Sequence, residues 1–427
     1  MERALAPRWL AAVLLSCVTI VALGAEPLPR AKPEEVGLSS ERLGRVTTVF
    51  QKYVDDGKLA GGVILVARKG KLAYLQAFGF RDREAKAAMR DDSIFRIASQ
   101  SKALTSVAIM ALQKQGKLIL VDPVRKFLPE FSETTVAVPR TDGGGGGYDV
   151  VKANRPITIR DLLTHMAGLS YGEGIAADKW KAAGIQSWYF AARNEPVGAT
   201  ISRMAGLPFD AQPGERWIYG YSIDVLGAIV EKASGKKLDE YIRSTITEPL
   251  KMADTAFFLP KAQRDRLTVV YSGDKTPVAR VPDGLEQGQQ GAYVDGPRKS
   301  FSGGAGLLST AGDYARFLQM LLNGGELDGV RILSRKSVEL MTTDHIPGKS
   351  FRNGQGFGLG FSIVKDVGAF GAPSSVGEYG WGGAYHSTYW VDPKEQMVVV
   401  YLTQLKPAPD ESDQPTLRAL IYQSIVD

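Results

Sequence analysis

Apolar residues near the start of the chain follow first a helical and then a strand-like pattern. Ser39 and Ser40 can cap a helix whose apolar positions, from Leu43 to Val54, recur at helical spacing. Two apolar runs follow over residues 63–67 and 72–75, with a short polar turn between them. The pattern predicts one helix followed by a hairpin of two strands.

The last third of the chain has the same mixture of patterns. An amphipathic helix is predicted from Asp313 to Asn323, where two glycines end it. Strand-like segments follow over 387–391 and 397–402, and a terminal helix is predicted over 415–426. The middle of the chain is predominantly helical in pattern, with long loops.

Strands near both ends and helices between them predict an α/β fold. One sheet built from the two ends, with a mostly helical insertion, is the simplest arrangement. The α/β part would cover about 39–100 and 300–427, and the helical part about 101–299, all within a unit of 26–427. A functional site is expected in the cleft between the two parts.

The N-terminus has the pattern of a secretory signal peptide. Arg3 and Arg8 precede an apolar run from Trp9 to Leu23, and small residues follow it. About 15 apolar residues are short for a membrane span, so we expect cleavage after a signal peptide of residues 1–25, export to the periplasm or medium, and no stable membrane insertion afterwards. The only cysteine, Cys17, lies inside this run, so a lipid anchor there is the weaker alternative.

Composition excludes several classes of function. The chain has 427 residues with 52 basic and 46 acidic side chains, a formal net charge of +6, and the basic residues are dispersed. A nucleic-acid-binding protein would show a basic patch or stripe, so no nucleic-acid partner is expected. A mature chain without cysteine excludes disulfides and thiol catalysis. Three scattered histidines indicate no metal site.

Ser99 and Lys102 form a Ser-x-x-Lys pair at the start of a run of helix-forming residues that ends near Gly116. Residues three apart share one face of a helix, so the Lys102 ammonium can approach the Ser99 hydroxyl. Free N–H groups at a helix start can stabilise an anion. Because a serine hydroxyl needs a neighbouring base to become a good nucleophile, the pair predicts a nucleophile and its proton acceptor.

Four further motifs follow this pair in order: Leu162–Leu169, Trp217–Ser222, Gly303–Thr310 and Trp381–Ala384. With them the chain resembles the serine β-lactamase-like superfamily, and more closely the family VIII carboxylesterases, which are relatives of class C β-lactamases. The resemblance extends from about Ser39 to the end. It implies a β-lactamase-like fold: an antiparallel sheet from the N- and C-terminal parts, flanked by helices, with a mostly helical inserted domain.

The resemblance also implies a role for each matched position. Ser99 would be the acylated nucleophile, and Lys102 and Tyr219 would act on its proton and on the leaving group. The backbone N–H groups of Ser99 and Ala384 would form the oxyanion hole. Which of Lys102 and Tyr219 is the base stays open. The residues implied to contact substrate are Tyr221, Trp381, Gly382, Gly383 and His386. No cofactor and no metal are implied.

Two departures from the class C pattern point to the substrate. Class C enzymes have Tyr-x-Asn where this chain has Tyr219-Gly220-Tyr221, and Lys-Thr-Gly where it has Trp381-Gly382-Gly383. The missing lysine helps those enzymes to hold a substrate carboxylate, and an indole gives a flatter, more apolar wall. Trp-Gly-Gly is the version that resembles the esterases. We therefore expect a serine carboxylesterase that acts on small, short-acyl esters through an acyl-enzyme, with at most weak β-lactam hydrolysis.

Three alternatives are open at this point. The first is a β-lactamase or D-Ala-D-Ala peptidase, and the second is a non-catalytic penicillin-binding-like module. The third places the nucleophile at Ser170, because residues 168–172 read Gly-x-Ser-x-Gly, with His345 or His386 completing a triad. That motif needs a strand before the serine and a helix after it, whereas the residues before it have a helical pattern. The sequence leaves the oligomeric state open.

Overall fold

The computed structural model describes residues 28–140, 147–408 and 412–427. The expected signal peptide over residues 1–25, including Cys17, lies outside the described residues, as does most of the glycine run that begins at Gly143. Within the described part of the chain, no helix is both long and apolar enough to cross a bilayer.

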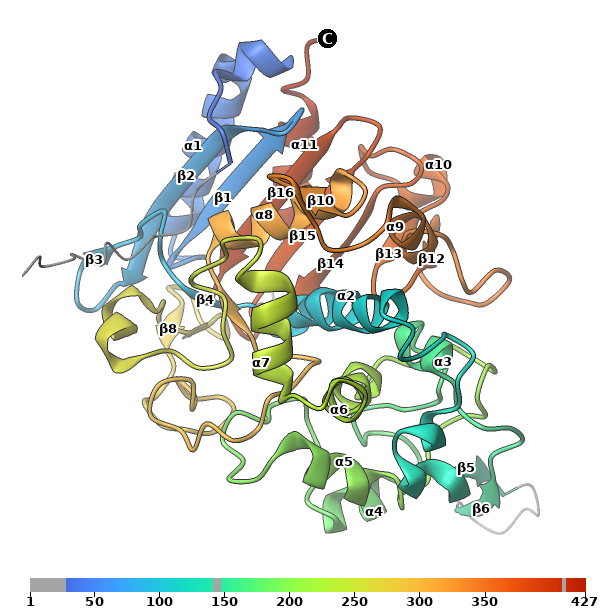
Figure 1. Ribbon diagram of the computed structural model, residues 1–427. Coiled ribbons are helices and arrows are strands. Elements are labelled where there is room, and N and C mark those ends of the chain that lie inside the picture. The colour runs from blue at the N-terminus through green and yellow to red at the C-terminus, as the bar shows by residue number, and fades with distance from the viewer. Residues whose placement is uncertain (1–27, 141–146, 409–411) are drawn as a thin grey trace, which may run out of the picture.

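One antiparallel sheet of eight strands organises the molecule, in the order β12-β13-β14-β15-β16-β1-β2-β3. The N-terminal hairpin β1–β2 pairs directly with the C-terminal strand β16, for example through Leu65 and Val400. Figure 1 shows these blue and red strands side by side. The sheet joins the two ends of the chain, as predicted. Its strands are β1 (Gly61–Arg68), β2 (Lys71–Asp82), β3 (Ala87–Ala88), β12 (Gln355–Phe357), β13 (Ser362–Val364), β14 (Tyr379–Gly383), β15 (Ser387–Asp392) and β16 (Met397–Thr403).

Helices cover both faces of this sheet, and this explains why β1 and β16 are apolar at almost every position. Alternate residues of a strand point to opposite faces. Ile64 faces the cluster that contains α1 (Ser40–Asp55) and α11 (Asp413–Tyr422). Leu65 faces the larger core that contains α2 (Ser101–Lys114) and α8 (Ala311–Leu322). Ser39 caps α1, as the sequence predicts.

Between α2 and α8 the chain consists of short helices and short strands joined by long loops, and it forms the lower half of Figure 1. Its apolar side chains join those of α2 in one core. The helices are α3 (Ile159–Leu163), α4 (Ala177–Ala182), α5 (Val197–Met204), α6 (Ser222–Ser234) and α7 (Leu238–Ile242), and the short strands are β5 (Thr135–Pro139), β6 (Tyr148–Lys152), β7 (Tyr271–Ser272), β8 (Ala279–Arg280) and β9 (Leu308–Ser309). Strand β4 (Phe95–Arg96) precedes α2 and pairs with β9. After α8 come β10 (Glu326–Leu327), β11 (Val330–Arg331), α9 (Arg335–Met341) and α10 (Val367–Phe370).

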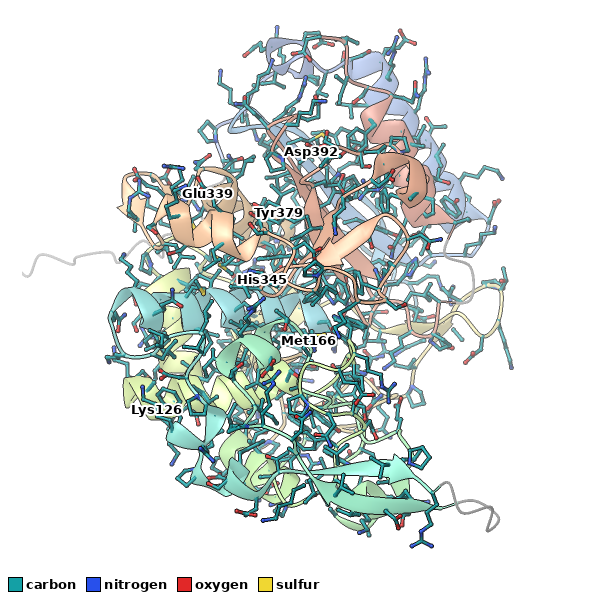
Figure 2. The ribbon with its side chains drawn as sticks, turned by 90° about the vertical axis from the view of Figure 1, so that its right-hand side faces the viewer. Lys126, Met166, Glu339, His345, Tyr379 and Asp392 are labelled. Carbon is teal, nitrogen blue, oxygen red and sulfur yellow. The ribbon has the colours of Figure 1, made fainter. Side chains whose placement is uncertain are left out.

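An aromatic boundary separates the helical half from the sheet. Met166 of the helical half packs against Ile346 and Phe357, and Trp217 and Trp381 border this cluster. Figure 2 shows Met166 on one side of the boundary, with Tyr379 and Asp392 on the sheet side. Trp381 also lines the pocket that contains Ser99, Tyr171 and Tyr219, so this pocket lies beside the boundary.

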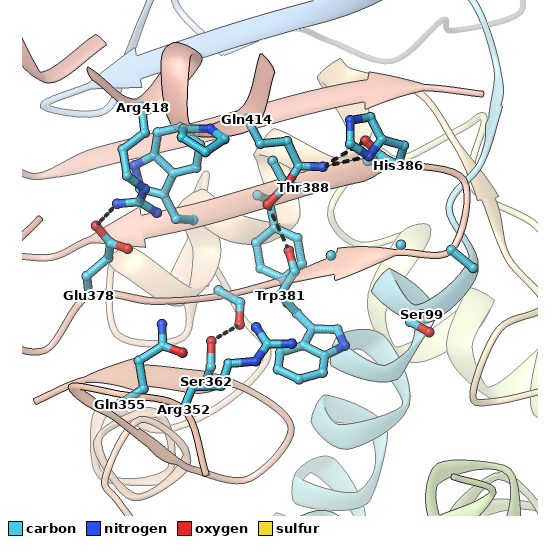
Figure 3. A pocket seen from close by; sticks show the side chains of 18 of the residues that line it. Ser99, Arg352, Gln355, Ser362, Glu378, Trp381, His386, Thr388, Gln414 and Arg418 are labelled. Carbon is cyan, nitrogen blue, oxygen red and sulfur yellow. Dashed lines mark hydrogen bonds and ion pairs between the residues drawn. The ribbon is translucent and has the colours of Figure 1, made fainter. Parts of the chain in front are cut away.

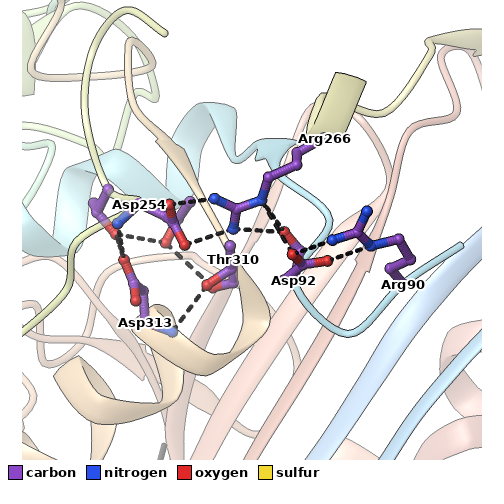
Figure 4. Close-up of polar contacts among 8 residues, drawn as sticks. Arg90, Asp92, Asp254, Arg266, Thr310 and Asp313 are labelled. Atoms are coloured by element: carbon purple, nitrogen blue, oxygen red, sulfur yellow. Dashed lines mark hydrogen bonds and ion pairs between the residues drawn. The ribbon is translucent and has the colours of Figure 1, made fainter. Parts of the chain in front are cut away.

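A charged cluster anchors the loops beside the nucleophile segment (Figure 4). The Arg266 guanidinium forms ion pairs with Asp254 at 2.6 Å and Asp92 at 3.3 Å. The backbone N–H of Asp254 donates to the Asp313 carboxylate at 2.8 Å, and Thr310 caps the helix that contains Asp313. The loop before β4 and the start of α8 are thereby tied together.

Candidate active site

Ser99 lies on a turn between a short strand pair and a long buried helix. Strand β4 pairs with β9, which fixes the chain up to Arg96. A 3₁₀ turn over Ala98–Gln100 then leads into α2, and Ala98 has a φ of 42°, in the left-handed region that is uncommon for alanine. This turn directs Ser99 into a pocket of about 730 Å³ (Figure 3).

Lys102 is held one turn into the helix by three polar contacts. Its Nζ lies 3.2 Å from Ser99 Oγ, 3.1 Å from the Tyr171 hydroxyl and 2.7 Å from the Gly304 carbonyl oxygen. The side chain is buried, so a fixed set of partners replaces water around the amine. Because Lys102 Nζ donates to the Gly304 carbonyl and the Tyr171 hydroxyl, its third hydrogen-bonding site points toward Ser99 Oγ. The spacing that the Ser-x-x-Lys motif predicts is therefore present as a direct contact.

Asp224 holds the carbonyl that anchors Lys102. Its Oδ1 accepts hydrogen bonds from Ser302 Oγ at 2.6 Å and from the Gly304 N–H at 3.1 Å. Burial raises the pKa of Asp224, and the positive charge of Lys102 opposes that shift. A Cβ on Gly304 would lie 2.4 Å from the Asp224 carboxylate, so only glycine fits there. This explains the glycine run of the Gly303–Thr310 motif.

Tyr171 is a site residue that the sequence reasoning missed. It lines the pocket beside Ser99 and accepts the hydrogen bond from Lys102. Burial raises the pKa of Tyr171 well above its ordinary value, so the phenol stays protonated. The one signal in the sequence is its position directly after Ser170 in the Gly-x-Ser-x-Gly segment.

Tyr219 lies on the same pocket wall and is fixed by its aromatic neighbours. Its ring centroid is 4.6 Å from Lys102 Nζ, and its hydroxyl accepts a hydrogen bond from Trp381 Nε1 at 3.0 Å. His165 packs behind it with ring centroids 4.8 Å apart. Burial, and next the charge of Lys102, hold the pKa of His165 well below its usual range. His165 is thus a neutral packing residue, and Trp381 orients Tyr219 besides forming the wall.

The Trp381-Gly382-Gly383 segment lies in a strand of the main sheet, directly before β15. It forms the end of β14, and Trp381 lies opposite Tyr389 of β15. Glycine is a poor strand former, so the sequence does not predict this strand, and its pairing with β15 identifies it. A Cβ on Gly383 would lie 2.7 Å from the Ile97 carbonyl oxygen, so the strand end packs directly on the nucleophile turn. Ala384, the next residue, lines the same pocket as Ser99.

Tyr221 lies behind the pocket and not on its surface. Its ring is stacked between Phe190 at 5.5 Å and Trp180 at 5.9 Å, and its hydroxyl donates to the Ser187 carbonyl at 2.6 Å. The side chain is completely buried. The substrate contact expected from its motif position is therefore not supported by its placement, because an aromatic stack takes the ring into the core.

His386 lines the pocket but is bound to α11. Its Nε2 lies 2.7 Å from the Asp413 carboxylate, and the Gln414 amide donates to the His386 carbonyl at 3.1 Å. Figure 3 shows the His386 ring beside Gln414, away from Ser99. This placement favours a structural role at the pocket rim.

Ser170 does not have the surroundings of a nucleophile elbow. The chain before it is the short helix α3 and a loop, with no strand, and its Oγ accepts the Gly172 N–H at 3.0 Å. A nucleophile elbow is a strand-to-helix turn. His345 Nε2 donates to the Leu340 carbonyl oxygen, 2.9 Å away, and His345 is not a partner of Ser170. Among the described residues, no group of three or more His, Cys, Asp or Glu side chains could hold a metal ion.

Comparison with known proteins finds the same family by sequence and by structure. The beta-lactamase family model matches residues 46–423. The chain is 32% identical to esterase EstB of Burkholderia gladioli over 377 residues, which is 84% of this chain and 89% of that protein. It is 36% identical to protein Rv1367c of Mycobacterium tuberculosis over 369 residues, 83% and 88% of the two chains. Among solved structures, EstCE1, a hydrolase with promiscuous acyltransferase activity, has a TM-score of 0.75 at 29% identity and covers 89% of this chain and 98% of its own.

Proposed function

The chain belongs to the beta-lactamase family, and we propose that it is a serine carboxylesterase of the family VIII type that hydrolyses short-acyl esters through an acyl-enzyme on Ser99. The observation that carries the proposal is the 3.2 Å contact between Lys102 Nζ and Ser99 Oγ, in a pocket whose wall is Trp381. The similarity to esterase EstB supports an ester as the substrate.

Acylation in this proposal begins with proton transfer. Lys102 accepts the Ser99 hydroxyl proton while Oγ attacks the ester carbonyl carbon, which forms a tetrahedral oxyanion. The backbone N–H groups of Ser99 and Ala384 stabilise that oxyanion. Because they are fixed before the charge develops, each donor can contribute about 3–4 kcal/mol to the lowering of the barrier.

Collapse of the intermediate needs a proton for the alcohol. The Tyr219 oxygen accepts the Trp381 N–H at 3.0 Å, so its own O–H is free to donate to the leaving oxygen. The proton that Lys102 took from Ser99 then passes to the Tyr219 oxygen by way of the Tyr171 hydroxyl, which lies 3.1 Å from Lys102 Nζ and interacts with Tyr219. A water molecule repeats the sequence on the acyl-enzyme and releases the acid. In this scheme Lys102 is the base and Tyr219 the proton donor.

The similarity to esterase EstB favours an ester over the β-lactam and peptide substrates of the two alternatives. We further propose that the N-terminal apolar run directs export to the periplasm or medium. The support is the sequence pattern of Arg3, Arg8 and the apolar residues that follow.

A substrate panel tests the proposed activity. Purified protein should hydrolyse p-nitrophenyl acetate and butyrate faster, in kcat/KM, than nitrocefin, and Ser99→Ala should abolish all three reactions. Ester hydrolysis that survives in Ser99→Ala would refute the assignment of the nucleophile. A larger kcat/KM for nitrocefin would transfer the proposal to the β-lactamase alternative.

A further inference from the structure

Arg352 brings a cation to the pocket wall that Trp381 forms. It lies in the loop between α9 and β12 and lines the same pocket as Ser99. Its guanidinium carbon is 4.7 Å from the centroid of the Trp381 ring and 5.6 Å from that of Phe351. Figure 3 shows the Arg352 side chain running along the indole of Trp381. The stack fixes the position of the charge.

Arg352 has no acidic partner among the residues that the structure describes. Partial burial lowers the pKa of Arg352. The other charged side chains of the pocket lining, Glu378 and Arg418, form an ion pair with each other at 2.7 Å. A partly desolvated cation without a counter-ion is unfavourable. Arg352 is therefore the one charged side chain of the pocket lining that has no ion-pair partner among the described residues.

The geometry of the stack leaves the binding edge of the guanidinium free. Trp381 occupies one face of the planar group, so the N–H edges stay available for hydrogen bonds in the plane. Those edges match the two oxygens of a carboxylate in a bidentate pair. A pocket of about 730 Å³ has room for an ester that reaches both Ser99 and Arg352.

We propose that Arg352 binds a carboxylate of the substrate, so that the preferred substrates are esters that carry one negative charge. This inference rests on the proposed esterase function and adds the substrate class. The tryptophan that replaces the class C lysine does not remove carboxylate recognition. It supplies the aromatic surface that holds an arginine from a different loop.

Two matched substrate pairs test the proposal and locate the carboxylate. In the first pair, p-acetoxybenzoate and its methyl ester, the charge is on the alcohol part. In the second, mono-p-nitrophenyl succinate and its methyl ester, the charge is on the acyl part. For each pair the measured quantity is the ratio of kcat/KM for the charged ester to that for the neutral ester, so general losses of activity cancel.

Arg352→Gln should lower this ratio at least about tenfold in one of the pairs, which is the effect of one lost charge-assisted hydrogen bond. Arg352→Lys should recover part of it. The matched control is Lys349→Gln, which removes a charge three residues away whose Nζ donates to the Glu215 carbonyl outside the pocket. It should change the ratio less than twofold.

Two results would overturn the inference. One is an unchanged ratio in both pairs for Arg352→Gln. The other is an equal fall of the ratio for Lys349→Gln, because that would indicate that the general positive potential near the pocket, and not a carboxylate bound to Arg352, causes the preference. Either result, with hydrolysis still dependent on Ser99, would leave the proposed esterase function intact.

Discussion

Replacement of Tyr171 by phenylalanine isolates one contact of the proposed base. The change removes the hydroxyl that lies 3.1 Å from Lys102 Nζ and retains the ring, which packs edge-on against Tyr221 at 4.9 Å. Lys102 would keep the Gly304 carbonyl as its fixed partner besides Ser99. The amine could then rotate away from the nucleophile in part of the population.

The expected loss follows from the strength of this hydrogen bond. A hydrogen bond to a charged group contributes about 1.5–3 kcal/mol, and each 1.4 kcal/mol is a factor of about ten in rate. Tyr171→Phe should therefore lower kcat/KM for p-nitrophenyl acetate roughly 10- to 150-fold. Because the lost contact positions the base and not the ester, most of the loss should fall on kcat.

Steady-state kinetics with a matched hydroxyl deletion measure this effect. Tyr241→Phe is the control, because that buried tyrosine bonds Gln115 and does not line the pocket. Urea unfolding of both variants separates stability from activity. A kcat for Tyr171→Phe within twofold of the wild type, with normal stability, would refute the role of Tyr171 in positioning Lys102.

Three further predictions concern other parts of the molecule. Ser170→Ala should retain at least half of the wild-type kcat/KM for p-nitrophenyl acetate, and a loss above a hundredfold would revive the elbow alternative. Tyr221→Phe loses the hydrogen bond to the Ser187 carbonyl, so its free energy of unfolding should fall by about 1 kcal/mol with little change in KM. A large rise in KM would support the substrate contact expected from the sequence. Burial raises the pKa of Asp313 to about 7, and the native state then retains a proton that the unfolded carboxyl, with a pKa of about 4, releases. Stability therefore falls as pH rises from about 4 to about 7. Asp313→Asn keeps an acceptor for the Asp254 N–H (Figure 4) and should reduce the difference in Tm between pH 5 and pH 8. An unchanged difference in Tm would contradict the raised pKa of Asp313.

Elements with strong local signals could be predicted from the sequence. Helix α1 has both a capping serine and a regular apolar face, and β1 and β2 are apolar runs joined by a turn. The nucleophile and lysine are three residues apart on one helix, so their contact is also local. In these cases the information needed lies within a few residues of the chain.

The remaining parts of the site depend on contacts between distant segments. Tyr171 meets Lys102 across 69 residues of sequence, and nothing near either residue indicates the pairing. Tyr221 occupies the position of the asparagine in the class C Tyr-x-Asn pattern, but its larger ring stacks on Phe190 in the core. Arg352 contacts Trp381 from another loop, and the residues next to Arg352 in the sequence do not indicate this contact. A one-dimensional pattern carries no signal for such pairs.

Covalent labelling tests the central claim most directly. The protein is treated with a fluorophosphonate, digested, and analysed by mass spectrometry to find the modified peptide, with Ser99→Ala treated in parallel. We predict one adduct, on Ser99, whose formation parallels the loss of ester hydrolysis, and no adduct in Ser99→Ala. An adduct on Ser170 or any other residue, or none on an active enzyme, would contradict the account.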